Sequence, residues 1–181
     1  MSLRWIQLSK IFVTWMFVSV SMPSWGSDYI YRAGLITGPF LPWDVTGIDE
    51  TMKVIGISSS AREQFGIGFE ASAFHSAESG AVINYATFGL VKSFQFPDLE
   101  FMEVLISAGV QLSYNRMAGV AGPDTPYTSG GGIYGSGGFA LQMSRRLEIQ
   151  PRMTLLNGSG RALLMEIGLQ YRFGEISQEA R

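Results

Sequence analysis

The stretch Leu163-Leu164-Met165-Glu166-Ile167-Gly168-Leu169-Gln170-Tyr171-Arg172-Phe173 decides the fold. Successive side chains of a β-strand point to opposite faces, so alternate residues share a face. A helix would repeat its apolar positions every three to four residues instead. The stretch therefore predicts a strand with one apolar and one largely polar face. The apolar face holds Leu163, Met165, Ile167, Leu169, Tyr171 and Phe173, opposite Leu164, Glu166, Gly168, Gln170 and Arg172.

Seven earlier segments are also predicted to be strands, which gives eight in all. Alternation is clear in 146–155 and weaker in most of the others, whereas 52–60 and 80–92 are extended in character without an assignable face. An even number of strands, each about 9–14 residues long, suits an all-β, antiparallel, up-and-down barrel that crosses a bilayer. The segments are 28–38, 52–60, 64–73, 80–92, 101–115, 133–144, 146–155 and 163–173.

The composition agrees with this fold class and excludes several functions. Hydrophobic residues make up 46% of the chain and charged residues only 15%, with 22 glycines, against a typical charged share of about 25%. A formal net charge of −2 without a basic cluster argues against nucleic-acid binding. The absence of cysteine excludes disulfides, thiolate chemistry and a lipidated-cysteine anchor.

Residues 1–26 are expected to be a cleaved signal peptide. Arg4 and Lys10 precede an apolar run over residues 11–20, and Pro23 with small residues follows before Ser27. The unbroken apolar run has about ten residues, whereas a membrane-spanning helix needs about 20. Residues 27–174 would then form the barrel and residues 175–181 a short polar tail.

The connections give an independent indication. If the first strand runs outward, the outer connections are 39–51, 75–79, 116–132 and 157–160, and the first and third are long. The connections on the other side are short or moderate, near residues 61–63, 96–98 and 144–145. Long loops at one end and tight turns at the other are typical of membrane barrels.

The charged residues of the strands lie on their polar faces, four of each sign. A soluble barrel would direct these faces to water, and a membrane barrel would direct them into its lumen. If these faces met lipid instead, placing each charged side chain in the hydrocarbon core would cost several kcal/mol of free energy. We expect the lumen placement, with a packed ion-pair plug and no open channel. The predicted cluster is Arg32, Glu70, Glu103, Arg146, Glu148, Arg152, Glu166 and Arg172.

The last strand also resembles the carboxy-terminal signal of bacterial outer-membrane barrels. That signal has a polar residue, a glycine two positions on and then hydrophobic residues in alternation, matched here by Glu166, Gly168, Tyr171 and Phe173. The chain departs from the usual form because it continues beyond Phe173. Residues 28–173 as a whole are similar to small barrels such as the transmembrane domain of outer-membrane protein A. The resemblance implies an outer-membrane location among lipid and lipopolysaccharide, with periplasmic chaperones and the barrel-assembly machinery as partners during biogenesis.

One site could carry hydrolytic chemistry. His75 is the only histidine, with Ser76 beside it and Glu78 nearby, and a serine hydrolase needs a base and an acid beside its hydroxyl. Barrels that deacylate lipid A carry His and Ser two positions apart on one strand face, whereas Ser76 is adjacent and would point the opposite way. Asp44, Asp49 and Glu50 are interpreted as solvated loop acids, so no metal or cofactor is expected.

The sequence therefore predicts a non-enzymatic outer-membrane barrel with a plugged polar lumen. Its loops 39–51 and 116–132 would serve surface interaction or envelope integrity, including contact with a protein partner. A lipid-modifying hydrolase and a small-solute porin remain the alternatives.

Overall fold

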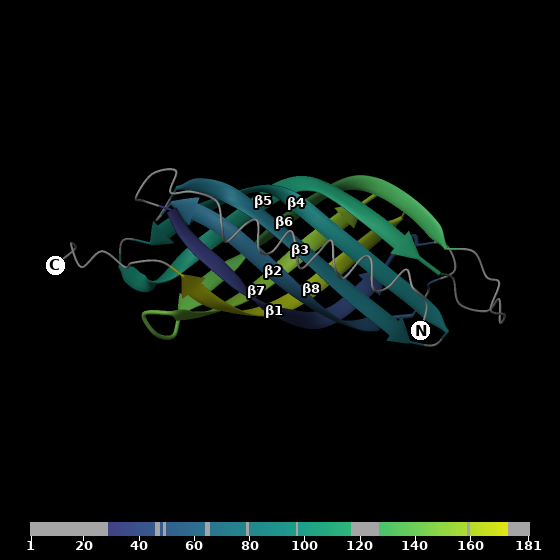
Figure 1. The fold of residues 1–181 in the computed structure, drawn as a ribbon, viewed down its shortest axis with the longest axis horizontal. Helices are drawn as coiled ribbons and strands as arrows, with labels where there is room; N and C mark the ends of the chain where they lie inside the picture. Colours follow the sequence, from purple (N-terminus) through teal and green to yellow (C-terminus); the bar gives the residue numbers. More distant parts are fainter. Residues whose placement is uncertain are drawn as a thin grey trace.

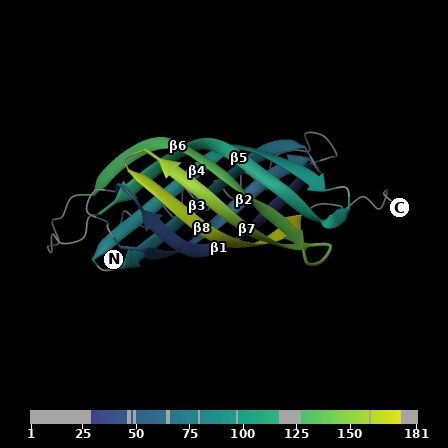
Figure 2. The same ribbon diagram turned by 180° about the vertical axis from the view of Figure 1, so that it is seen from behind.

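A computed structural model describes residues 29–45, 48, 50–63, 66–78, 80–96, 98–116, 127–158 and 160–173. Eight antiparallel strands close into one barrel in sequence order, steeply tilted to its long axis (Figures 1 and 2). In the described part of the chain, no helix has the length and hydropathy to span a membrane. The strands are β1 (Tyr29–Pro42), β2 (Met52–Glu63), β3 (Ile67–Glu78), β4 (Ala81–Phe96), β5 (Leu99–Asn115), β6 (Thr128–Gln142), β7 (Leu147–Asn157) and β8 (Arg161–Phe173).

The barrel closes where β1 pairs with β8. Their register runs from Tyr31 opposite Phe173 to Pro42 opposite Ala162, and both strands pair on their other sides with β2 and β7. No described strand is left with a free edge, which satisfies the backbone groups without a partner chain. The predicted fold class, an eight-stranded antiparallel up-and-down barrel, is confirmed.

The strands extend further than the alternation predicted. β1 reaches Pro42, β2 reaches Glu63 and β6 begins at Thr128, so the connections shrink. One end of the barrel, here called the loop end, carries connections 43–51, 79–80, 116–127 and 158–160. The opposite turn end carries connections 64–66, 97–98 and 143–146. The predicted asymmetry therefore persists only in the first and third connections of the loop end.

Several sequence predictions concern residues outside the described ranges. These are the signal peptide over 1–26, the polar tail over 175–181, Asp49, and residues 117–126 of the long third loop.

Apolar side chains face outward on the barrel wall, and most charged side chains of the strands point inward. The exceptions include Lys53, Glu63 and Arg161, which lie at strand ends and are exposed. On β5, Leu112 is 66% exposed, whereas its neighbour Gln111 is 1% exposed. The same inversion holds around the barrel because each strand keeps the two-residue period. The outward set includes Leu35, Ile55, Ile67, Phe69, Phe88, Leu90, Ile106, Val110, Ile133, Phe139, Met153, Leu155, Met165, Ile167 and Leu169; together these residues are called the apolar belt.

The interior has two halves of different character. Near the turn end it holds arginines, glutamates and glutamines, of which Arg32 and Arg62 are each 1% exposed. Near the loop end it holds a buried apolar cluster around Phe40, Phe74 and Tyr85. Rings of Phe74 and Tyr85 stack with centroids 5.3 Å apart, and Phe40 lies 5.5 Å from Tyr85. Glycines on the strands leave room for these large rings, as at Gly56, which pairs with Phe74.

Candidate functional site

Glu148 on β7 is the centre of the charged interior at the turn end. Its carboxylate lies 3.0 Å from Arg32 Nε of β1, 3.5 Å from Arg62 Nη2 of β2 and 3.6 Å from Arg172 Nε of β8. Arg62 also donates to Glu103 Oε2 of β5 at 3.2 Å. All of these side chains are largely buried, so their charges interact with little screening by water. We call these five residues the Glu148 network.

A second network surrounds Arg152 further along the same strand. Arg152 Nη1 and Nη2 donate to the two oxygens of Glu70 on β3 at 2.9 and 2.8 Å, which is a bidentate ion pair. Its Nε lies 3.7 Å from Glu166 Oε1 of β8. Tyr134 donates a hydrogen bond to Glu70, and Arg152 also donates to the Ser107 hydroxyl at 2.8 Å. We call Arg152, Glu70 and Glu166 the Arg152 network.

Each network alone carries a charge, and together they cancel. The Glu148 network holds three arginines and two glutamates, and the Arg152 network holds one arginine and two glutamates. The described interior is therefore neutral overall, with its positive end toward the turns. Within the described residues, several N–H groups of these arginines have no hydrogen-bond partner, including Arg32 Nη2 and Arg62 Nε; buried polar groups of this kind are ordinarily hydrated by ordered water.

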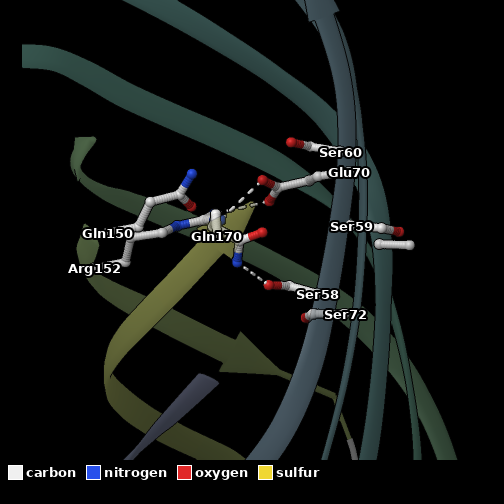
Figure 3. A pocket seen from close by; sticks show the side chains of 9 residues that line it. Ser58, Ser59, Ser60, Glu70, Ser72, Gln150, Arg152 and Gln170 are labelled. Carbon is white, nitrogen blue, oxygen red and sulfur yellow. Dashed lines mark hydrogen bonds and ion pairs between the residues drawn. The ribbon is translucent and has the colours of Figure 1, made fainter. Parts of the chain in front are cut away.

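A small polar cavity lies beside the Arg152 network (Figure 3). Ser58 and Ser60 of β2 point toward it, and Gln170 of β8 donates to the Ser58 hydroxyl across it. Its volume is about 10 Å³, enough for about one water molecule. Ser59 between them points to the other side of the strand (Figure 3). A cavity of this size has no room for a solute larger than water.

The structure places seven of the eight predicted cluster residues in the interior, and Arg146 is the exception. The prediction of a strand from residue 146 was wrong, because the turn continues through Arg146 and β7 begins at Leu147. Backbone N–H groups of Arg146 and Leu147 donate to the Ser144 hydroxyl. Arg146 is exposed, and its Nη1 donates to the Tyr171 hydroxyl at 2.9 Å. It therefore takes no part in the interior ion pairs.

Arg62 is an interior residue that the predicted cluster does not contain. It supplies the fourth positive charge that was expected from Arg146. The sequence pattern predicts a turn at residues 61–63, but β2 continues to Glu63, and Arg62 shares the inward face with Ser58 and Ser60. Continuing the two-residue period past residue 60 would have found it. The cluster keeps four charges of each sign with this exchange.

The expectation of a polar lumen describes only the turn half of the barrel. The loop half is filled by the apolar cluster, which also receives Val45 and Ile48 from the first loop. These two residues form a bridge and are 5% and 3% exposed. Trp43 N and Asp44 N both donate to the Arg161 carbonyl, which fastens the loop to β8. Part of loop 39–51 thus folds over the barrel end.

His75 and Ser76 point to opposite sides of the sheet, as their adjacency predicts. Ser76 is buried in the interior at 4% exposure, whereas His75 lies on the outward face of β3, partly exposed. His75 Nδ1 shares a hydrogen bond of 2.9 Å with Asn84 Oδ1 of β4. Position 77, which shares the face of His75, is an alanine. Among the described residues, no group of three or more His, Cys, Asp or Glu is arranged to hold a metal ion.

The residues that match the barrel signal lie on both faces of β8. Glu166 and Gly168 face inward, and Tyr171 and Phe173 face outward with their rings 4.9 Å apart. The exposed Tyr171 is the residue that Arg146 contacts at the turn end.

Comparison with known proteins identifies the fold. No family model matches the chain, and no curated protein matches its sequence. The N-terminal β-barrel domain of OprF from Pseudomonas aeruginosa is similar at a TM-score of 0.60, with 9% identity over 82% of this chain and 99% of that chain. Neisserial surface protein A gives a TM-score of 0.60, with 9% identity over 80% of this chain and 97% of that chain.

Ail, the attachment invasion locus protein of Yersinia pestis, is a third similar structure, solved in complex with the heparin analogue sucrose octasulfate. It gives a TM-score of 0.55, with 12% identity over 81% of this chain and 98% of that chain. At these identities the likeness shows a shared fold, which is that of the small outer-membrane β-barrels.

Proposed function

We propose that this chain is a non-enzymatic outer-membrane β-barrel protein whose interior is closed to solutes and whose loop end carries its interactions. The observation that carries the proposal is the inverted wall, with large apolar side chains outside and ion-paired charges inside. A soluble protein rarely exposes a continuous apolar surface of more than a few hundred Å². Lipid would remove the cost of exposing these side chains, about 25 cal/mol per Å².

In this proposal residues 1–26 are a signal peptide, residues 27–174 form the barrel and residues 175–181 are a tail. Assembly would proceed through periplasmic chaperones and the barrel-assembly machinery, which would read the strand that ends at Phe173. The loop end would then face the cell exterior and the turn end the periplasm.

A structural role fits the site better than catalysis does. A serine hydrolase needs its hydroxyl within reach of the base, but Ser76 and His75 lie on opposite faces of β3. The alternative of a lipid-modifying hydrolase thus lacks the geometry that its candidate residues would need.

Interaction at the loop end is supported by position and by one similar protein. The first and third connections there are the longest in the barrel, and connecting loops on a rigid scaffold commonly carry recognition. Ail, which shares the fold, has been solved with a sulfated sugar analogue. Because Val45 and Ile48 of the first loop are folded into the barrel end, we assign recognition chiefly to the third loop and to the strand ends beside it.

The location is tested by membrane fractionation of cells that express the full chain. We expect the protein in the outer-membrane fraction, with gel mobility that changes on boiling because the closed barrel resists detergent until heated. Recovery as soluble periplasmic protein with unchanged mobility would contradict the proposal.

The closed interior is tested separately by planar-bilayer recording of the purified barrel. We expect no discrete salt conductance, since packed ion pairs fill the turn half and the apolar cluster fills the loop half. Stepwise conductance that persists after repurification would favour the porin alternative.

A further inference from the structure

Two tyrosines and an arginine form a compact group on the outward face of the loop end. Tyr114 lies at the end of β5, Arg116 follows it, and Tyr127 immediately precedes β6. The rings of Tyr114 and Tyr127 stack with centroids 4.4 Å apart and planes within 2°. The Arg116 guanidinium lies 5.8 Å from the centre of the Tyr127 ring. We call these three residues the rim group.

Hydrogen bonds from neighbouring strands fix the backbone of the rim group. Arg116 and Val82 exchange two backbone hydrogen bonds of 2.8 and 3.0 Å, which extend the pairing of β4 and β5. Asn84 Nδ2 donates to the Tyr114 carbonyl at 2.8 Å, and the Thr128 hydroxyl donates to the Asn115 carbonyl. The group is thus held before any ligand arrives, which lowers the entropy cost of binding.

The contact that the structure gives the Arg116 guanidinium is with an aromatic ring. Within the part of the chain that the structure describes, Arg116 forms no ion pair with a carboxylate. A cation over an aromatic face is attracted by the ring without using its N–H groups. Arginine presents these groups as a planar fork that matches the oxygens of a phosphate. Among the described residues, the Arg116 guanidinium therefore has no anionic partner.

The position of the rim group indicates the source of that anion. On the same face of β5, Leu112 and Val110 face outward as part of the apolar belt, at 66% and 55% exposure. Tyr114 and Arg116 follow directly beyond them, at the level where lipid headgroups would lie. Lys53 on β2 is a second exposed cation on the outward face at this end. At this level the anion that Arg116 meets would be the headgroup of a membrane lipid and not a soluble anion.

We propose that the rim group binds the phosphorylated glucosamine headgroup of lipopolysaccharide in the outer leaflet. Arg116 would hold a phosphate through two parallel hydrogen bonds, and the open face of Tyr114 would pack against the sugar ring. This inference rests on the proposed outer-membrane location. It names a specific contact within that setting.

The test uses the full chain folded in phosphatidylcholine nanodiscs, titrated with diphosphorylated lipid A, lipid A without phosphates, and inorganic phosphate. The proposal predicts binding of diphosphorylated lipid A only. Arg116→Gln should weaken it by roughly tenfold or more, since the variant loses the charge and the paired donors that hold the phosphate. Arg116→Lys should fall between the wild type and Arg116→Gln, because lysine keeps the charge and loses the fork.

Arg146 provides a matched control, since it also contacts a tyrosine, Tyr171, but at the turn end. Arg146→Gln should leave lipid A binding unchanged. Equal binding by Arg116→Gln and wild type, an equal loss in both variants, or equal binding of phosphate-free lipid A would overturn the proposal. Heat-modifiable mobility is recorded for every sample. A folded barrel without lipid A preference contradicts the rim site alone, whereas loss of the mobility shift in the wild type contradicts the proposed function.

Discussion

At the scale of single residues, Glu148 connects strands that share no backbone hydrogen bonds. It lies on β7, while its partners Arg32 and Arg62 lie on β1 and β2, across the seam where β8 meets β1. Removing the carboxylate would leave three buried guanidinium groups to share the remaining acid, Glu103. Breaking a buried ion pair from one side costs far more than the pair contributes, because the charge left behind has lost its partner.

We therefore predict that Glu148→Gln lowers the free energy of unfolding by about 3–5 kcal/mol. The measurement is a urea titration of the barrel in lipid vesicles, followed by the fraction with folded gel mobility. Glu63→Gln is the control, since Glu63 is an exposed end residue of β2, and its effect should stay within about 0.5 kcal/mol. Equal stability of the two variants would show that the Glu148 network does not hold the barrel.

Single charged residues near strand ends were the hardest to predict. Arg62 and Arg146 both stand next to turn-forming residues, and the pattern alone did not tell which of them lies inside a strand. The difference is made by local hydrogen bonds, since the Ser144 hydroxyl caps the β6–β7 turn at Arg146. The other seven predicted charges fall in segments whose two-residue period was recognised, so their face was assigned correctly even for Glu148 and Arg172, which lie next to strand ends.

At the scale of elements, all eight strands were predictable, but their ends were not. Alternation marks a strand wherever one face meets apolar surroundings, as in β7 and β8. Toward the loop end both faces are apolar, so the alternation fades. Ile36 and Phe40 of β1, for example, lie on the same inward face as Arg32. They are apolar and belong to the buried cluster.

The β1–β8 seam depends on glycine where the two backbones approach closely. A Cβ atom at Gly34 would lie 1.9 Å from the Leu169 carbonyl oxygen, and one at Gly38 would lie 1.9 Å from that of Met165. These are backbone atoms, so the strands themselves would have to separate.

We predict that Gly34→Ala lowers the midpoint of the heat-induced mobility change, at a cost of about 1–3 kcal/mol from overpacking. Gly131→Ala is the control, because its added Cβ would be 3.7 Å from the nearest atom outside its chain neighbours. A midpoint equal in both variants would mean that the seam tolerates separation.

At the scale of the whole molecule, the sequence could predict the inverted wall but not the divided interior. The wall follows from one period repeated on every strand. The apolar cluster draws Phe40, Phe74 and Tyr85 from three strands and Ile48 from a loop, and which of them meet depends on the register of closure. The rim group escaped prediction for the same reason, since Tyr114 and Tyr127 are brought together by the pairing of β5 with β6.

We propose that the apolar face of each strand meets lipid and that the polar face fills the interior. Because the chain contains no cysteine, single cysteines can be placed along β8 from Leu163 to Tyr171 and spin-labelled in lipid vesicles. We predict that labels at odd positions collide freely with oxygen, which dissolves in lipid, and that labels at even positions meet neither oxygen nor a water-soluble nickel complex. Odd positions accessible chiefly to the nickel complex, or the absence of a two-residue period, would contradict the lipid-facing placement of the apolar side chains.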